Sequence, residues 1–246
     1  MSELTTFPTE IIELPSKGLP YPESSLLSSG KIEMKYMTAK EEDILTNSSY
    51  IKQGIVLDKL LQSLIVTKID FNELLTGDKN AILIASRVLG YGKDYSFEYK
   101  GEKVNVDLSL LENKKIDETI FTKGKNEFEF KLPSTDNTVT FKLLNHGDEQ
   151  KIDRELESLK KINQSPEMSM RLKHTIVSVN GTSDSKLIRE FVDNHLLAKD
   201  ARALREYIKS IQPDINLIAN IETSNGLMEG VNVPIGLSFF WPDLGV

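Results

Sequence analysis

Residues 35–66, KYMTAKEEDILTNSSYIKQGIVLDKLLQSLIV, decide the fold class of this chain. Thr38 and Glu41 match a capping box, in which a threonine oxygen and a glutamate carboxylate satisfy free amides of a first helical turn. A helix is therefore predicted from Thr38 to about Asn47. Apolar side chains then recur at helical spacing and predict a second helix from Ile51 to Val66. They cover more than one face, so this helix packs either entirely inside the core or partly against a partner protein.

Two shorter helices are predicted after this stretch. Asp70 is a good N-cap residue and starts a short helix that Gly77 would end, because glycine is common just past the last helical turn. Asp78 would then cap a further helix that ends at Gly90. Residues 31–92 are therefore expected to form a helical block.

The chain before this block is rich in proline. Pro15, Pro20 and Pro22 lie among glycines and serines between residues 11 and 31. Proline lacks the amide proton that helices and central strands need, so residues 1–30 are predicted to form an extended arm. The arm would either lie along a neighbouring subunit or wrap around its own domain, and the sequence does not separate these alternatives.

The period of the apolar pattern changes after the helical block. Over residues 95–108, apolar and polar residues alternate on both sides of the turn Lys100-Gly101-Glu102, which predicts a β-hairpin. The same alternation in Phe128–Leu132 and Val139–Leu143 predicts a second hairpin. Residues 93–144 are therefore assigned to a β-hairpin region.

Helical periodicity returns in residues 145–213. Asp148 starts a helix with a narrow apolar stripe, and Pro166 starts another turn of helix. Two clearer helices, from Asp184 to Leu197 and from Asp200 to Ile211, are predicted to pair as a helical hairpin.

Strand-forming residues occur in Ile176–Val179 and again in the last region, residues 214–246. There, strands are predicted from Ile215 to Ile221 and from Val231 to Trp241, joined by a turn at Ser224-Asn225-Gly226. Helical blocks thus alternate with antiparallel β-hairpins, which predicts an α+β fold. Together, the regions after the arm would make one or two compact domains.

Composition and charge narrow the range of functions. The 246 residues carry 37 acidic and 30 basic side chains, and the net charge of −7 disfavours nucleic acid or an anionic membrane as a partner. There is no cysteine, and hence no thiolate nucleophile, disulfide or sulfur-ligated metal. The N-terminal residues lack the pattern of a signal peptide, and no apolar run is long enough to cross a bilayer.

Motifs of enzymes are missing as well. No serine has the flanking glycines of a nucleophile elbow, and His146, His174 and His195 are too far apart to be paired ligands on one helix. The triplet Glu41-Glu42-Asp43 falls in a first helical turn, where negative charge favours the helix dipole. We therefore expect a protein that is not an enzyme, with no catalytic residues, no cofactor and no metal.

Several motifs in the chain resemble those of a known family. They include LPSKG at 14–18, MKYMTAKEEDILT at 34–46, RVLGYG at 87–92, DARALR at 200–205 and FFWPD at 239–243. With these motifs the chain resembles the baseplate hub proteins of T4-like contractile-tailed phages over nearly its whole length.

The resemblance implies a role in the virion or in its assembly. The chain would be synthesised in the bacterial host cytoplasm and become a structural or assembly component of the tail baseplate hub. Its partners would be other baseplate or tail proteins, with self-association as a further expectation. The alternative is a transient hub-assembly chaperone that is absent from the mature virion. A tail-associated cell-wall hydrolase is a third and less favoured function, because it would need a carboxylate pair that the sequence does not announce.

The resemblance also implies a C-x-x-C-G pair in each of the two β regions, as in family members of this kind. Two such pairs would form a split zinc ribbon. This chain departs from that pattern, because the matching positions read FEYKGE at 97–102 and ETSNG at 222–226. No metal can be carried over. Our hypothesis is that the two β regions still pack together as a metal-free ribbon in which buried aromatic side chains replace the ion.

The expected partner interface combines the helical block with two distant segments. Arg202 and Arg205 would clamp a carboxylate of the partner, or else pair internally with Asp200 or Glu206. The full set of predicted interface residues is Tyr36, Ile51, Ile55, Leu57, Leu61, Arg202, Arg205, Phe239 and Trp241.

Overall fold

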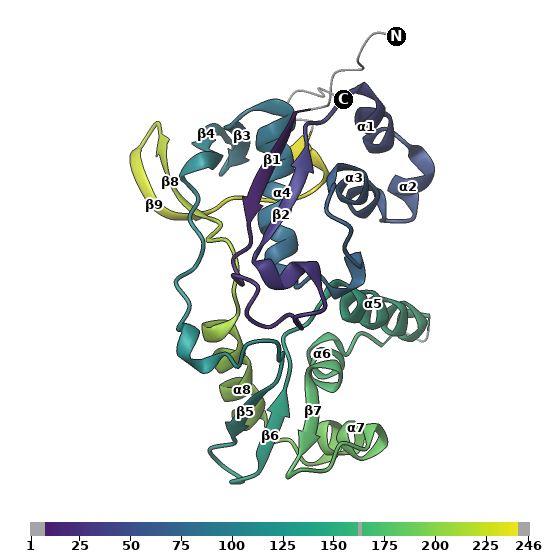
Figure 1. The fold of residues 1–246 in the computed structure, drawn as a ribbon. Helices are drawn as coiled ribbons and strands as arrows, with labels where there is room; N and C mark the ends of the chain where they lie inside the picture. The colour runs from purple at the N-terminus through teal and green to yellow at the C-terminus, as the bar shows by residue number, and fades with distance from the viewer. Residues whose placement is uncertain (1–7, 162–163, 241–246) are drawn as a thin grey trace.

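A computed structural model describes residues 8–161 and 164–240 of the chain. Over these residues, eight α-helices and several small antiparallel sheets alternate, which confirms the predicted α+β class. Figure 1 shows an upper part that contains helix α4 (Thr76–Tyr91) and a lower part built around strands β5 (Phe128–Lys131), β6 (Thr138–Phe141) and β7 (Ile176–Val179). One continuous set of buried apolar side chains runs from Leu14 to Phe240, and a small second set lies under helix α5.

The predicted arm folds back on its own chain. Strand β1 (Thr9–Glu13) pairs antiparallel with β2 (Lys31–Lys35), and the connection between them carries the short 3-10 helix η1 (Leu26–Ser29). Leu14, Tyr21 and Leu27 in this connection are buried. The residues described from 8 onward thus follow the second of the two alternatives, in which the arm wraps around its own domain.

A buried carboxylate explains why the proline-rich connection packs inward. Asp78 is fully buried and accepts hydrogen bonds from the amide and the hydroxyl of Ser16, at 2.9 and 2.7 Å, and from the hydroxyl of Tyr21, at 2.6 Å. Burial raises the pKa of Asp78, although these three hydrogen bonds act in the opposite direction. The sequence assigned Asp78 to a helix cap, and this was wrong, because its side chain anchors the N-terminal segment.

Helix α4 (Thr76–Tyr91) begins earlier than predicted and includes Gly77 within its first turn. A Cβ atom on this glycine would overlap the carbonyl oxygen of Pro213. Glycine is therefore needed for a close approach of two segments and does not end a helix. The predicted helix before it is reduced to the 3-10 helix η2 (Phe71–Glu73), whose first residue follows the Asp70 cap.

The stretch that decides the fold class forms three helices where two were predicted. Helix α1 (Ala39–Leu45) starts at the capping box, with the amide of Thr38 donating to the Glu41 carboxylate at 3.0 Å. The predicted long second helix is broken into α2 (Ser48–Lys52) and α3 (Val56–Leu64). Gly54 lies at the break with a φ of 69°, a left-handed conformation that continues no helix.

The first and last hairpins pack together, as the ribbon hypothesis requires. Strands β3 (Asp94–Tyr99) and β4 (Glu102–Asp107) form one hairpin, and β8 (Ile218–Thr223) and β9 (Gly226–Asn232) form the other. Strand β4 lies against β8, and the amide of Ser224 donates to Glu102 at 2.6 Å.

Aromatic side chains join the first hairpin to the end of the chain. The ring centroids of Tyr95 and Phe239 are 4.8 Å apart in an edge-to-face arrangement, and Tyr95 stacks on Phe97. Arg87 is buried beside them and donates to the backbone carbonyls of Gly92, Asp94 and Phe239. The strand predicted over residues 231–241 ends at 232, because the chain turns into the 3-10 helix η5 (Leu237–Phe240).

The lower part of the molecule is a three-stranded sheet with helices around it. Its strands are β5 (Phe128–Lys131), β6 (Thr138–Phe141) and β7 (Ile176–Val179), in that order, which confirms the second predicted hairpin. The surrounding helices are α6 (Glu167–Thr175), α7 (Ser185–Asn194) and α8 (Ala198–Ile211).

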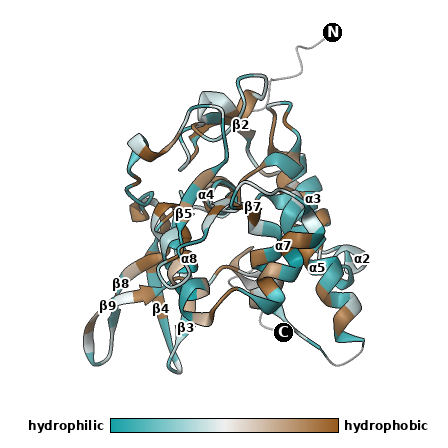
Figure 2. Ribbon diagram, turned by 90° about the horizontal axis from the view of Figure 1, so that it is seen from below, coloured by the Kyte–Doolittle hydropathy of each residue, from teal (hydrophilic) through white to brown (hydrophobic). Residues whose placement is uncertain are grey.

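The prediction that α7 and α8 pair as a helical hairpin was wrong. Helix α8 reaches β5 and β6 through Tyr207, whose ring stacks on Phe130 with centroids 4.9 Å apart. Helix α7 packs instead on α6 and β7. Figure 2 shows that apolar and hydrophilic residues alternate in bands along α7. This amphipathic pattern explains why the helix buries a single face.

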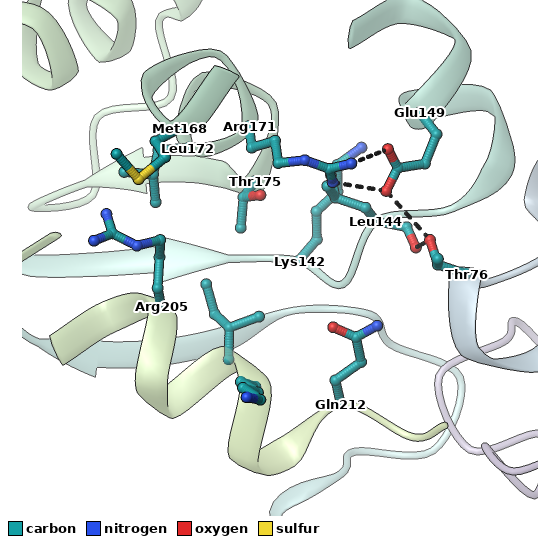
Figure 3. A pocket seen from close by; sticks show the side chains of 12 residues that line it. Thr76, Lys142, Leu144, Glu149, Met168, Arg171, Leu172, Thr175, Arg205 and Gln212 are labelled. Carbon is teal, nitrogen blue, oxygen red and sulfur yellow. Dashed lines mark hydrogen bonds and ion pairs between the residues drawn. The ribbon is translucent and has the colours of Figure 1, made fainter. Parts of the chain in front are cut away.

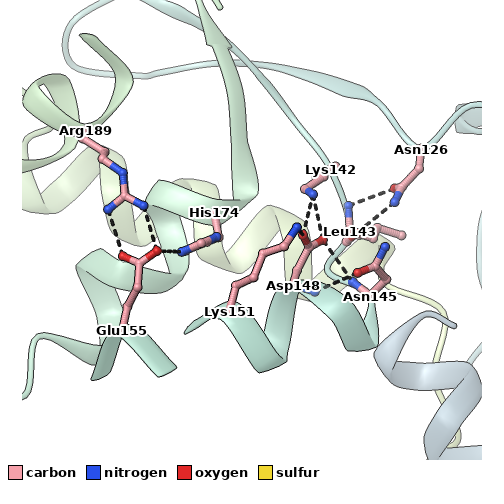
Figure 4. A network of polar contacts seen from close by, with 9 residues as sticks. All are labelled: Asn126, Lys142, Leu143, Asn145, Asp148, Lys151, Glu155, His174 and Arg189. Carbon is pink, nitrogen blue, oxygen red and sulfur yellow. Dashed lines mark hydrogen bonds and ion pairs between the residues drawn. The ribbon is translucent and has the colours of Figure 1, made fainter. Parts of the chain in front are cut away.

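Helix α5 (His146–Lys160) joins the two parts, and polar contacts fix it on both sides (Figure 4). Near its start, Asn145 caps the helix by accepting from the amide of Asp148, so the helix begins two residues before its predicted start. Farther along, Glu155 accepts two hydrogen bonds from the Arg189 guanidinium, at 3.0 and 2.9 Å, and lies 2.9 Å from the His174 ring. Residues of α5, α6 and α7 are thereby tied together.

Candidate partner-binding surfaces

Two of the predicted interface residues lie in the core of the folded chain. Leu61 on α3 and Phe239 on η5 both have 0% of their surface exposed. A partner cannot reach either side chain without unfolding the chain, which corrects their place in the interface. The apolar stripe of α3 faces inward because Leu60, Leu61 and Leu64 pack against the rest of the core.

The other predicted residues of the helical block are accessible to different degrees. Ile51 on α2 is exposed, whereas Tyr36, Ile55 and Leu57 are half-buried. The hydroxyl of Tyr36 donates to the Glu10 carboxylate at 3.0 Å, so this side chain helps to hold β1. These residues therefore leave a smaller exposed apolar area around α2 and α3 than the sequence suggested.

The two arginines of α8 have different surroundings. Arg202 pairs with Glu206 one turn along the same helix, at 2.8 Å, which is the internal pairing considered as an alternative. Arg205 lines a groove between α6 and α8. The remaining predicted residue, Trp241, lies outside the described part of the chain.

A cavity of about 430 Å³ lies between α3, α4 and α5, and its polar wall is a compact ionic cluster. The ammonium of Lys79 contacts Asp58 at 2.5 Å and the Nδ1 atom of His146 at 3.2 Å. Because an ammonium only donates, Nδ1 of His146 accepts from Lys79, while its Nε2 lies 3.2 Å from Asp58 and 3.0 Å from the side-chain nitrogen of Gln150.

This cluster serves to join helices. Burial would raise the pKa of Asp58, but hydrogen bonds from His146 and Lys79 outweigh that effect and lower the pKa. Asp58 comes from α3, Lys79 from α4 and His146 from α5. Asp58 therefore binds all three helices to one another through its contacts with Lys79 and His146.

The groove between α6 and α8 has a volume of about 300 Å³. Figure 3 shows Arg205 extending from α8 toward Met168 of α6, with Gln212 pointing into the same space. At one end, the guanidinium of Arg171 binds Glu149 with two hydrogen bonds, at 2.9 and 2.8 Å. We call this site the α6–α8 groove, and it combines an apolar floor with a basic rim.

A third surface lies beside the two packed hairpins. Leu110 and Ile218 line a hollow of about 350 Å³ between β4 and β8, and they are 75% and 49% exposed. Leu227, next to the turn of the β8–β9 hairpin, is 61% exposed. In Figure 1 this hairpin projects from the body of the molecule. We call these three residues, together with the hollow that Leu110 and Ile218 line, the hairpin surface.

The described residues offer no obvious place for metal chemistry, since no three histidine or acidic side chains among them are grouped as metal ligands. None of the helices described is both long and apolar enough to span a membrane.

Sequence reasoning missed both the α6–α8 groove and the hairpin surface. The groove combines residues from α4, the connection between β6 and α5, α5, α6 and α8, and no local pattern marks such a distant set.

Three comparisons with known proteins give one positive result. No curated protein and no solved structure matches the chain. Residues 13–231 match the family model described as T4 bacteriophage base plate protein. The match covers both packed hairpins, the α6–α8 groove and most of the core, and it extends over far more than half of the chain. The chain therefore belongs to the T4 bacteriophage base plate protein family.

Proposed function

We propose that this baseplate protein is a structural subunit of the tail hub and acts through protein–protein contacts, without catalysing a reaction. Membership of the baseplate family supports the location, and the motifs that resemble hub proteins support the finer assignment. The observation that carries the mode of action is the hairpin surface, where Leu110 and Ile218 are exposed beside one hollow and Leu227 is exposed near the turn of the projecting hairpin.

Exposed leucine and isoleucine side chains lose contact with water when a partner covers them, and this transfer is favourable by about 25 cal/mol for each Å² of apolar surface. Apolar residues at the centre of an interface commonly dominate its binding energy. The β8–β9 hairpin also has few neighbours to its outer side, so a partner meets little steric hindrance there. Contact of β8 with β4, and the hydrogen bond from Ser224 in the hairpin turn to Glu102, would hold the exposed side chains in place for a neighbouring subunit.

The test is quantitative mass spectrometry of purified tails. A structural hub subunit is expected at a fixed ratio to the other baseplate proteins in finished particles. A chain that binds tail intermediates but is missing from finished tails would instead be a transient hub-assembly chaperone. Cleavage of peptidoglycan by the pure protein, lost on substitution of one carboxylate, would contradict a non-enzymatic role.

A pair of matched variants tests the surface itself. Leu110→Asp places a charge on the hairpin surface, and we expect incorporation into tails to fall at least about tenfold while the circular dichroism of the free protein is unchanged. Leu187→Asp makes the same change at a leucine of α7 that is 54% exposed and belongs to neither surface. Equal incorporation of both variants would contradict a role for the hairpin surface.

A further inference from the structure

The α6–α8 groove has an apolar floor that the chain itself leaves partly uncovered. Met168, which borders the groove, is 67% exposed, although methionine gains free energy from burial. The apolar lining of the groove is completed by Leu144 from the connection between β6 and α5, Leu172 from α6 and Ile208 from α8. An adaptable methionine beside fixed aliphatic side chains is a common feature of surfaces that accept a partner's side chain.

The rim of the groove is strongly basic. Four cations line it, and Glu149 is the single carboxylate among its lining residues. Glu149 is already bound by Arg171, and Lys142 is bound by Asp148 at 2.7 Å. Arg205 and Lys209, by contrast, form no ion pair with any residue in the described part of the chain. Two cations thus face the groove without a counter-charge, on a chain whose net charge is −7.

We propose that the α6–α8 groove binds a segment of another baseplate protein in which a carboxylate lies beside an apolar side chain. The carboxylate would bind the guanidinium of Arg205, whose planar fork donates two parallel hydrogen bonds, with Lys209 adding a second positive charge. The apolar side chain would cover Met168 and the aliphatic floor. This inference rests on the proposed function, because it takes the partner to be a protein of the same assembly.

Charge complementarity and the shape of the floor favour this occupant over a polyanion. A nucleic acid backbone offers phosphates but few aliphatic groups to cover a floor of leucine, isoleucine and methionine. The acidic surface of the rest of the chain would also repel a long polyanion. A short acidic and apolar protein segment satisfies both the rim and the floor.

The test uses short overlapping peptides that span the other tail proteins encoded with this chain, and measures their binding to the full chain by fluorescence anisotropy. Peptides with a carboxylate next to an apolar residue are expected to bind. Arg205→Glu should weaken that binding by at least about tenfold, because it places two like charges together. Met168→Asp should also weaken peptide binding, because it places a charge beside the apolar floor of the groove.

Two controls separate the groove from general charge effects. Lys199→Glu reverses an exposed cation of the same helix outside the groove, and it should leave binding unchanged. A peptide whose carboxylate is replaced by lysine should regain affinity for the Arg205→Glu protein, since the reversed pair is again complementary.

The proposal fails if no peptide binds, or if bound peptides are insensitive to Arg205→Glu. It also fails if the groove-dependent ligand is duplex DNA, a phosphatidylserine vesicle or a second copy of this chain, each tested with the same variants. These outcomes are distinct from failure of the hub proposal. Absence of the chain from finished tails would refute that proposal and leave peptide binding measurable.

Discussion

Helix α3 and the α6–α8 groove are both rich in aliphatic side chains, yet only the groove leaves them within reach of a partner. On α3, the side chains of Leu60, Leu61 and Leu64 are at most 1% exposed. At the groove, Met168 is 67% exposed and lies beside cations that have no counter-charge among the described residues. The density of apolar residues along a helix therefore does not distinguish core from interface, whereas exposure combined with unpaired charge does.

The two regions also differ in how their charges are used. Around α3, Asp58 is shared by Lys79 and His146, and Glu41 by Lys35 and Thr38, so each carboxylate holds structure. Around the groove, Arg205 remains available. We expect substitutions on the α3 side to change stability, and substitutions in the groove to change binding.

The largest expected effect is the loss of folding in Leu61→Asp. A carboxylate at a fully buried position has no partner, so the free energy of unfolding should fall by more than about 4 kcal/mol in chemical denaturation. Ile51→Asp is the matched control, because Ile51 is 39% exposed on the neighbouring helix α2 and should tolerate the charge. If the Leu61→Asp protein is stable and fails only in assembly, then α3 contacts a partner and the assignment of Leu61 to the core is contradicted.

The next effect concerns pH on the α3 side. Burial alone would raise the pKa of Glu41, but hydrogen bonds from Lys35 and Thr38 lower it to about 2, from an ordinary 4.5. Because the folded-state pKa is depressed, this stabilisation is complete above pH 4.5 and is lost as pH falls toward 2. The lowered pKa of Glu41 thus contributes about 3 kcal/mol to the free energy of unfolding at neutral pH.

Glu41→Gln should therefore be less stable than the wild type at pH 7 and should approach it between pH 4.5 and 2, as followed by urea denaturation. The control Glu23→Gln changes an exposed carboxylate and should keep the wild-type pH profile. A stability gap that stays constant between pH 7 and pH 2 would contradict the assigned role of Glu41.

A smaller effect is expected where the core supports the groove. Gly77→Ala adds a methyl group against the carbonyl of Pro213, just after α8, and should cost about 2 kcal/mol through overpacking. Because Thr76 and Gln212 beside this contact line the groove, peptide affinity should fall as well. Gly236→Ala, at a glycine with open space around it, should change neither stability nor affinity. An unchanged melting temperature for Gly77→Ala would show that the contact relaxes freely.

The smallest change in stability is expected from Arg205→Glu. The side chain lies at the rim of the groove and makes no ion pair within the described residues, so the free energy of unfolding should change by less than about 0.5 kcal/mol. Thermal denaturation measures this, alongside the peptide titration. Marked destabilisation would mean that Arg205 is a structural residue and would remove the contrast between the two regions.

Local signals in the sequence predicted much of the fold. The capping box at Thr38, the alternation around Lys100-Gly101 and the aromatic strand at Phe128 each correspond to an element of the structure. Their physical causes act within a few residues, so a single segment contains the necessary information. The packing of the two distant hairpins was also anticipated, although only through the resemblance to hub proteins.

What could not be predicted depends on contacts between distant segments. Gly77 and Asp78 have the sequence pattern of a helix boundary, but Pro213 and Ser16 determine their roles. Likewise, Leu61 and Met168 are both apolar residues on helices, and only the folded chain shows which one is covered. The α6–α8 groove belongs to this second class, because it exists only once five separate elements meet.

Oxidative footprinting of Met168 tests the central contrast most directly, because a thioether reports its own accessibility through its rate of oxidation. The rate is measured in the free chain and in tails assembled from the same preparation. We predict that oxidation of Met168, which is 67% exposed in the free chain, falls severalfold on assembly, while that of the buried Met34 stays low in both states. Equal oxidation of Met168 in free and assembled protein would contradict the assignment of the α6–α8 groove as a partner-binding surface.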